Sequence, residues 1–178
     1  MKKILFSLLI LTLLPVVKAS AANDGDVVEA YLFDPVGNFT NIRVAPKGAV
    51  KVKLNNKGEY EPCFSLVDYK NGWWKIKYCG DATESPEGEK LCKKAIGGYI
   101  HYSCVGIGTR NYGGQHIHLY ATANHKSKVV YTIKEETIVR PVGVASGGTW
   151  VKVKTADGKH EGWIQSEWLC SNPLTNCC

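Results

Sequence analysis

Short runs in which apolar and polar residues alternate recur along this 178-residue chain from residue 23 onward. Residues 50–54 alternate valine or leucine with lysine, and residues 73–78 and 150–155 show the same period of two. Successive side chains of a strand point to opposite faces, so this period predicts strands that are buried on one side. Turn signals such as Asn71-Gly72 and Asp157-Gly158 end the runs. The pattern therefore predicts an all-β protein built from short strands and hairpins.

One phrase occurs twice in the chain. The first copy reads GWWKIK at residues 72–77 and GYIH at 98–101, and the second reads WVKVK at 150–154 and GWIQ at 162–165. The upstream spacing agrees, because Ile42 precedes Trp73 by 31 positions and Leu119 precedes Trp150 by 31. Downstream, the first copy is longer by 13 positions, which equals the separation of Cys79 and Cys92. The repeat indicates a duplicated β-unit whose first copy carries an insertion.

The N-terminus has the form of a targeting segment. Two lysines precede an apolar stretch at residues 4–17, and Ala19-Ser20-Ala21 supplies a cleavage site. The apolar stretch is shorter than the roughly 20 residues that span a bilayer. We therefore expect cleavage after residue 21, export to the periplasm or the cell exterior, and no membrane insertion afterwards. The mature length, 178 minus 21, is 157 residues, which suits one ordinary domain or two small ones.

Charge argues against a nucleic-acid partner. Removing the three lysines of the leader lowers the net charge from +6 to +3, and the mature chain has no uninterrupted basic block. A nucleic-acid-binding protein is expected to carry a clustered basic stripe.

Seven cysteines, all in the exported part, predict disulfides in an oxidising compartment. Cys79 and Cys92 bracket the insertion and form the best pair. Cys63 with Cys104, and Cys170 with Cys177 or Cys178, are the further expected pairs, although spacing alone does not fix connectivity. One thiol is left over, either free or intermolecular. The paired C-x-x-C spacing of a zinc site is missing from the sequence.

Several of these motifs resemble the bacterial SH3-like domain. They are NIRVAP at residues 41–46, the turn and tryptophan at Gly72-Trp73, and the later glycine–aromatic–isoleucine run; HLYATA at 118–123 is the diverged start of the second copy. The resemblance implies two small SH3-like β-barrels in tandem. After a signal peptide at 1–21, we expect the first at residues 22–110, with a disulfide-bracketed hairpin insertion, and the second at 111–178. We place the junction in the glycine-rich stretch 106–115. Members of that family are exported binding modules, often attached to cell-wall peptidases. The resemblance implies peptidoglycan, its peptide stems or proteins as ligands.

Strand alternation also predicts a contact surface. In the first copy, Trp74, Ile76 and Tyr78 share one strand face, and Trp73 lies among lysines on the other. The second copy repeats this arrangement. The residues that we expect to contact a ligand are Trp73, Tyr99, Trp150 and Trp163, with Lys75 and Lys152 as charge partners. The alternative is that these rings pack beneath a loop or between the two barrels.

Catalysis and cofactor binding are not expected. The sequence contains none of the H-E-x-x-H, G-x-S-x-G or glycine-rich phosphate motifs. Cys104 lies near His101, but alternation places the two on opposite faces, and two barrels leave no room for a peptidase scaffold. His116 and His118 share a face, yet a metal site needs three or four ligands. We expect no metal and no other cofactor.

The acidic segment at residues 80–90 leaves a second function open. If a disulfide tethers it, ordering it on binding costs less, and it can act as a recognition element. The chain would then be an extracytoplasmic inhibitor or immunity-type protein that blocks a partner enzyme. A tolerated surface insertion is the simpler interpretation. A third function is an assembly module linked through the odd cysteine. The first expectation remains a binder of a peptidoglycan fragment or of an envelope or secreted protein.

Overall fold

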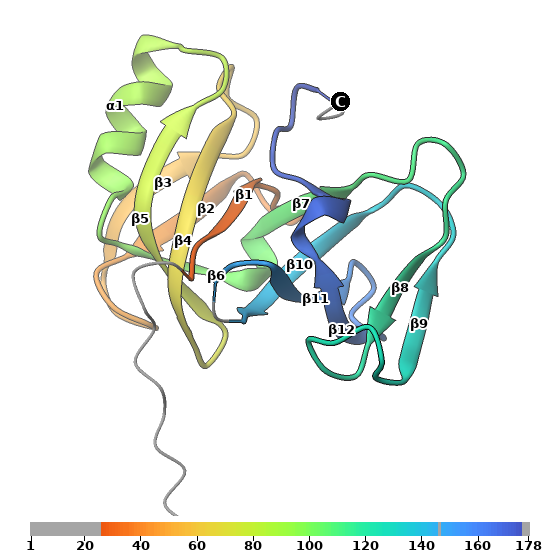
Figure 1. The fold of residues 1–178 in the computed structure, drawn as a ribbon. Coiled ribbons are helices and arrows are strands. Elements are labelled where there is room, and N and C mark those ends of the chain that lie inside the picture. Colours follow the sequence, from red (N-terminus) through yellow and green to blue (C-terminus); the bar gives the residue numbers. More distant parts are fainter. Residues whose placement is uncertain (1–25, 146, 176–178) are drawn as a thin grey trace, which may run out of the picture.

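A computed structural model describes residues 26–145 and 147–175 of the chain (Figure 1). In these ranges the chain forms short strands, one α-helix and two 3-10 turns, which confirms the predicted all-β fold of the SH3-like kind, apart from that helix. The strands are β1 (Val28–Leu32), β2 (Phe39–Arg43), β3 (Val50–Asn55), β4 (Pro62–Lys70), β5 (Trp73–Asp81), β6 (Tyr99–His101), β7 (Val105–Thr109), β8 (Ile117–Tyr120), β9 (Val129–Ile133), β10 (Ile138–Val144), β11 (Trp150–Thr155), β12 (Glu161–Gln165) and β13 (Leu169–Cys170). The helix is α1 (Pro86–Ala95), and the 3-10 turns cover Tyr102–Cys104 and Ser166–Trp168.

The strand pairing occurs twice in the same order. In the first half the antiparallel neighbours run β1-β4-β5-β6-β2-β3, and in the second half they run β7-β10-β11-β12-β8-β9. Each half then passes through a 3-10 turn into a strand that pairs with its own first strand, β7 with β1 and β13 with β7. We call residues 26–104 the N-terminal unit and residues 105–175 the C-terminal unit. Strand β7 pairs with both β1 and β10, so one sheet continues across the two units.

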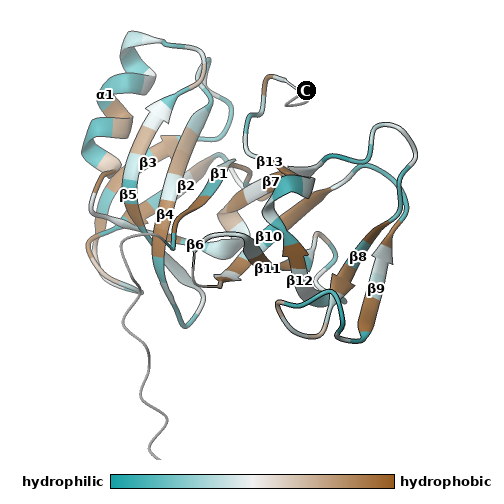
Figure 2. Cartoon of the chain, viewed as in Figure 1, coloured by the Kyte–Doolittle hydropathy of each residue, from teal (hydrophilic) through white to brown (hydrophobic). Residues whose placement is uncertain are grey.

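Alternation places the core as the sequence predicts. Trp74 and Ile76 in β5 and Val153 in β11 are fully buried, and so are Ile100 and Ile164 on the next strands. Figure 2 shows apolar residues along the strands and hydrophilic residues on the exposed side of α1. The buried side chains of both units form one continuous cluster. Among the described residues, no helix is long and apolar enough to cross a membrane.

Tyr78 is the position where the predicted alternation fails. Ile76 pairs with Leu66 and Tyr78 with the adjacent Ser65, so Lys77 is an additional residue on β5. A bulge of this kind reverses the inward and outward order of the residues that follow. Tyr78 is therefore 58% exposed, and Cys79 takes the buried position.

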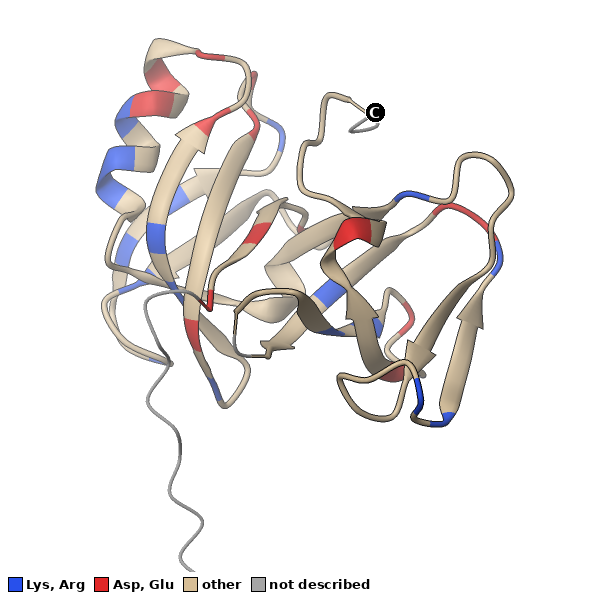
Figure 3. Cartoon of the chain, viewed as in Figure 1, with Lys and Arg blue, Asp and Glu red and all other residues tan. Residues whose placement is uncertain are grey.

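The insertion is a helix and not the predicted hairpin. The Ser85 hydroxyl caps α1 by accepting a hydrogen bond from the Gly88 amide at 3.0 Å, and Pro86 occupies the first turn. Glutamates occupy the first turn and lysines the last, as the helix dipole favours (Figure 3). These are helix start and stop signals that the sequence contains. They outweigh the strand pattern of the flanking segments because α1 buries Cys92 and Ala95 against β5 and β3.

The cysteines confirm one predicted pair and correct another. Cys79 and Cys92 are bonded, whereas Cys63 and Cys104 are free thiols. Cys63 lies on β4 and Cys104 directly before β7, and these strands flank β1 on opposite sides. Two strand spacings separate them by about 10 Å, beyond the roughly 7 Å between Cα atoms that a disulfide spans. Cys170 is also disulfide-bonded; its expected partners, Cys177 and Cys178, lie outside the described residues.

Removing the disulfide of α1 is expected to destabilise the protein. The double variant Cys79→Ala/Cys92→Ala opens a loop of 13 residues, for which the chain-entropy model gives about 3 kcal/mol. Urea unfolding followed by tryptophan fluorescence measures the change. The single variants serve as controls because each loses the same bond, so they should be destabilised about as much as the pair. A double variant as stable as the wild type would show that packing alone holds α1.

Buried polar contacts join the two units. Arg140 of β10 donates hydrogen bonds to the carbonyl oxygens of Phe33 and, at 2.8 Å, of Val105. Its guanidinium carbon lies 4.6 Å from the centre of the Phe33 ring. The indole nitrogen of Trp74 donates to the Pro141 carbonyl at 2.9 Å. These contacts, with the shared strand β7, fix the units against each other.

Candidate functional site

The six predicted contact residues occupy equivalent positions in the two units. Lys75 pairs with Tyr99 across β5 and β6, and Lys152 pairs with Trp163 across β11 and β12. All of them are partly exposed, on the outward face opposite the buried isoleucines and valines. The structure thus brings each lysine beside an aromatic ring of the neighbouring strand, while the two sets lie on separate units.

In the C-terminal unit, an aromatic cluster forms around Trp150. Its ring centre lies 5.7 Å from that of Tyr120 and 4.8 Å from that of His125, and the last two are 5.6 Å apart. The rings meet at steep angles of 65° to 88°, the edge-to-face arrangement that aromatic pairs prefer. We call Tyr120, His125 and Trp150 the aromatic cluster.

Three different elements supply the aromatic cluster. Tyr120 ends β8, where it pairs with Trp163 of β12, and Trp150 begins β11. His125 comes from the turn between β8 and β9, which the hydrogen bond from the Ala121 amide to the Lys128 carbonyl closes at 2.9 Å. Sequence reasoning missed Tyr120 and His125. The alternation of β8 is a signal for Tyr120, whereas only the folded turn brings His125 to the cluster.

A cavity of about 270 Å³ adjoins the aromatic cluster. It is lined by His116, Ile117, His118, Tyr120, His125, Gln165, Glu167 and Trp168. His118 also contacts the Thr132 hydroxyl through its Nδ1 atom at 3.0 Å. Three histidines therefore border one hollow, yet no three potential metal ligands converge anywhere in the described ranges. The cavity offers imidazole and amide groups for hydrogen bonding to a ligand.

The N-terminal unit also carries a group of three rings, around Trp73, the counterpart of Trp150. The Trp73 and His101 ring centres are 5.2 Å apart, and those of His101 and Tyr102 are 4.7 Å apart. Burial lowers the pKa of His101, so this imidazole is neutral at physiological pH. Lys154 of the other unit lies over the Tyr102 ring at 5.5 Å. The aromatic group of the N-terminal unit is thus partly covered by the C-terminal unit.

The lysines of the surface are paired within the protein. Glu161 lies 2.5 Å from the Lys152 ammonium and 3.2 Å from that of Lys154. The hydrogen bond from Lys152 is the main cause that lowers the pKa of Glu161, so this carboxylate is ionised at neutral pH. Lys75 lies 4.0 Å from Asp68. Both lysines that the sequence predicted as charge partners of a ligand therefore lie near a carboxylate of the protein itself.

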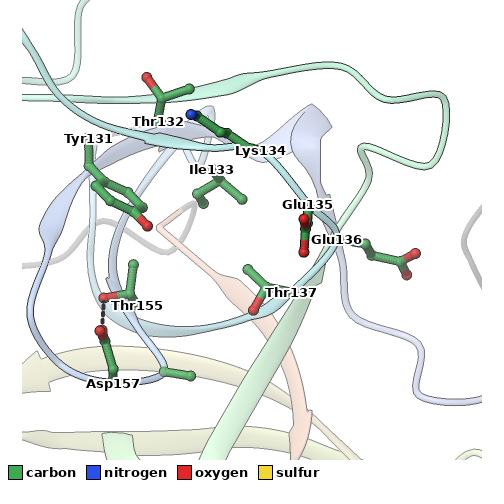
Figure 4. A pocket seen from close by; sticks show the side chains of 10 residues that line it. Tyr131, Thr132, Ile133, Lys134, Glu135, Glu136, Thr137, Thr155 and Asp157 are labelled. Carbon is green, nitrogen blue, oxygen red and sulfur yellow. Dashed lines mark hydrogen bonds between the residues drawn. The ribbon is translucent and has the colours of Figure 1, made fainter.

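Two larger cavities lie away from the predicted residues. One of about 620 Å³ opens between β9 and the end of β11 (Figure 4). The other, of about 560 Å³, adjoins it and reaches Tyr31 and Phe33 of the N-terminal unit. Neither is lined by any of the six contact residues predicted from the sequence.

The two free thiols are not activated. Burial, reinforced by nearby carboxylates, raises the pKa of both Cys63 and Cys104 to about 11. A thiol with such a pKa is protonated at neutral pH and is a poor nucleophile. The nearest histidine in sequence, His101, directs its Nδ1 atom to the Ser103 hydroxyl at 2.8 Å.

Comparison with known proteins identifies part of the chain. Residues 116–169 match the family model of the bacterial SH3 domain, and no curated protein sequence matches the chain. Among solved structures, NlpC1 from Trichomonas vaginalis aligns with 88% of this chain and 50% of its own length, at 12% identity and a TM-score of 0.30. For NlpC2 from the same organism the values are 83%, 49%, 12% and 0.31. This chain thus spans about half the length of either protein. The segment that runs from β8 through β12 and contains the aromatic cluster is therefore similar to the bacterial SH3 domain.

Proposed function

We propose that this chain is an exported, non-catalytic binding module that recognises cell-wall glycan through the aromatic cluster of its bacterial SH3 domain. The observation that carries the proposal is the grouping of Tyr120, His125 and Trp150 on the outward face of β8 and β11, beside a cavity. Aromatic rings that stay partly exposed and adjoin a polar hollow are typical of a contact surface. The match to the bacterial SH3 domain supports a binding role.

The charge of the surface favours sugar over peptide stems. Acidic stems carry carboxylates and require unpaired cations, whereas Lys152 and Lys154 both contact Glu161. A sugar ring offers an apolar face for stacking on an aromatic ring, and hydroxyls for hydrogen bonds. Gln165 and the histidines that line the cavity supply donors and acceptors for such hydroxyls.

Export is proposed from the leader-like N-terminus and from the disulfides. Cys79–Cys92 and the bonded Cys170 form and persist in an oxidising compartment. The absence of catalysis is proposed from the motifs of the sequence and supported by the protonated thiols, because a cysteine enzyme needs a thiolate.

Substitution of Trp150 tests the proposed function. Trp150→Ala removes the ring that contacts both other members of the cluster, and central aromatic residues of binding sites contribute 2 kcal/mol or more. We therefore expect retention on purified peptidoglycan to fall about 30-fold. Sedimentation of the protein with insoluble peptidoglycan measures it. Trp73→Ala, the equivalent change in the N-terminal unit, is the matched control and should retain binding.

The same assay separates glycan from peptide. Peptidoglycan whose stems have been removed by an amidase should still retain the wild-type chain, and soluble stems should not compete. Competition by stems alone would contradict the glycan assignment while leaving wall binding in place. If intact peptidoglycan retains none of the protein, the proposed function is wrong.

A further inference from the structure

The two units differ in what lies beside two equivalent strands. In the N-terminal unit, α1 packs against β3 and β5. The repeat makes β9 and β11 the counterparts of these strands. Between β9 and the end of β11, where the C-terminal unit lacks a helix in its described residues, the cavity of about 620 Å³ opens instead.

The strand register places the two regions in correspondence. Cys79 pairs with Phe64, which pairs with Ala30; Thr155 pairs with Val139, which pairs with Ile107. Ala30 and Ile107 are both buried residues on the first strand of their units. Thr155 is therefore the counterpart of Cys79, the residue that bonds to α1. Thr155 lines the cavity, and so does its neighbour Ala156.

The cavity also borders an uncovered sheet edge. Strand β9 is the last in the strand order and pairs only with β8 among the described residues. Its Val129 and Val130 are 40% and 41% exposed. The counterpart strand β3 is also the end of the strand order, with Val50 42% exposed, but α1 packs against it, and the Lys51 ammonium donates to the Ile96 carbonyl just beyond the helix at 2.5 Å. Natural proteins cover exposed edges or use them for partners.

The lining of the cavity indicates the chemistry of its occupant. Tyr131, Ile133 and Ala156 provide an apolar surface, and Thr137 and Thr155 add hydroxyls (Figure 4). Stacking on His160, with ring centres 3.9 Å apart, holds Tyr131 in place. Three carboxylates, Glu135, Glu136 and Asp157, and one lysine, Lys134, line the cavity, and a second lysine, Lys159, lies 3.8 Å from Asp157. The net charge of these groups is −1, three acids minus two lysines, which favours a cationic partner.

We propose that this cavity is a docking site for a short basic helix of a partner protein, which would lie on β9 and β11 as α1 lies on β3 and β5. The N-terminal unit shows the mode: α1 turns its small residues Gly88, Cys92 and Ala95 to the sheet. This site is distinct from the aromatic cluster and does not depend on glycan binding.

Disulfide trapping tests the proposal. The probe is a synthetic peptide with the sequence of residues 85–96, whose cysteine matches Cys92, carrying Glu87→Lys and Glu89→Lys. The full-length chain carries Ala156→Cys, because Ala156 is exposed and lines the cavity. In a glutathione redox buffer, mass spectrometry measures the mixed disulfide, with the wild-type chain as background. We expect at least tenfold more peptide captured at position 156 than by the control Ala121→Cys, another exposed alanine, in the β8–β9 turn.

Charge provides the second comparison. The unaltered peptide of residues 85–96, which keeps both glutamates, should be captured at least fivefold less at position 156. Adding Glu135→Lys to the Ala156→Cys chain should lower capture of the basic peptide by a similar factor. The docking site would be contradicted by equal capture at positions 156 and 121. It would also be contradicted if the basic and the unaltered peptide were captured in equal amounts.

Discussion

Trp74→Ala is expected to lower the free energy of unfolding by about 4 kcal/mol, the largest effect of any single change that we describe. Trp74 is fully buried in β5, and its ring centre lies 4.8 Å from that of Tyr69. Truncating a buried tryptophan to alanine costs about 3–5 kcal/mol, because the cavity that it leaves only partly collapses. The change also leaves the Pro141 carbonyl of the other unit without its indole donor. Chemical denaturation followed by circular dichroism measures the loss.

Trp74→Phe separates packing from hydrogen bonding. It keeps most of the ring volume and removes the N–H, so about 1–3 kcal/mol should be lost through the unsatisfied carbonyl. Because Trp74 joins the units, both should unfold in one shifted transition. A variant in which the N-terminal unit alone is destabilised would show that the contact with Pro141 does not couple them.

Asp81→Ala is expected to cost about 3 kcal/mol. Asp81 is only 6% exposed, and its carboxylate accepts hydrogen bonds from the residue that directly precedes β4 and from the segment before α1. It accepts hydrogen bonds from the Glu61 amide at 2.7 Å, from the Ser85 amide and hydroxyl at 2.9 and 2.7 Å, and from the Thr83 hydroxyl at 2.8 Å. Removing it leaves several part-buried donors without this partner, and a fully buried donor left unsatisfied costs about 1–3 kcal/mol. Chemical denaturation at pH 7 measures the difference.

Asp81 also makes the free energy of unfolding depend on pH. Burial raises the pKa of Asp81, but the hydrogen bonds from Ser85, Glu61 and Thr83 outweigh it and lower the pKa from 3.8 to about 2. A carboxyl whose folded pKa is depressed stabilises the fold above its unfolded pKa, and this contribution is lost as pH falls through the folded value. The wild type should therefore lose about 2 kcal/mol between pH 5 and pH 2 that Asp81→Ala does not lose.

Glu61 changes the pH dependence of stability in the opposite direction. The pH profile of the wild type must therefore be compared with that of Asp81→Ala. Burial and the charge of Asp81 raise the pKa of Glu61. Its contribution to stability is therefore present at low pH and is lost as pH rises through that pKa. Subtracting the pH profile of Asp81→Ala removes most of this background. Parallel profiles of the wild type and the variant would contradict the role assigned to Asp81.

The strands were predictable because their pattern is local. Burial of Ile76, Val153 and Ile164 follows from alternation along each strand, and the repeat of the tryptophan-led phrase anticipates the repeated pairing order. Where alternation along one strand failed, the pairing with the neighbouring strand set the direction of the side chain. The bulge opposite Ser65 turns Tyr78 outward, and no residue of β5 by itself signals that additional position.

The site was predictable only in part. Alternation correctly placed Trp150 on an outward face, but a strand pattern contains no information on which turn folds over that face. His125 reaches Trp150 because the β8–β9 turn closes through the Ala121 amide. Likewise, alternation did not predict that Lys152 contacts Glu161 of the adjacent strand. Pairing across strands depends on register, which a single run of residues does not specify.

The class of fold, the repeated strand pattern, the insertion between Cys79 and Cys92, and the outward face of the paired tryptophans could all be predicted from the residues alone. These follow from short-range periodicity and spacing, which act within one strand or between two copies of a phrase. Only the tertiary structure decided which thiols meet, how α1 lies on the sheet, and that the counterpart region of the C-terminal unit is an open cavity. Those outcomes depend on strand order, since β1 separates Cys63 from Cys104 and the order β12-β8-β9 places β9 at an end of the sheet. Neighbours across a sheet are far apart along the chain, so their contacts exist only once the strands have paired.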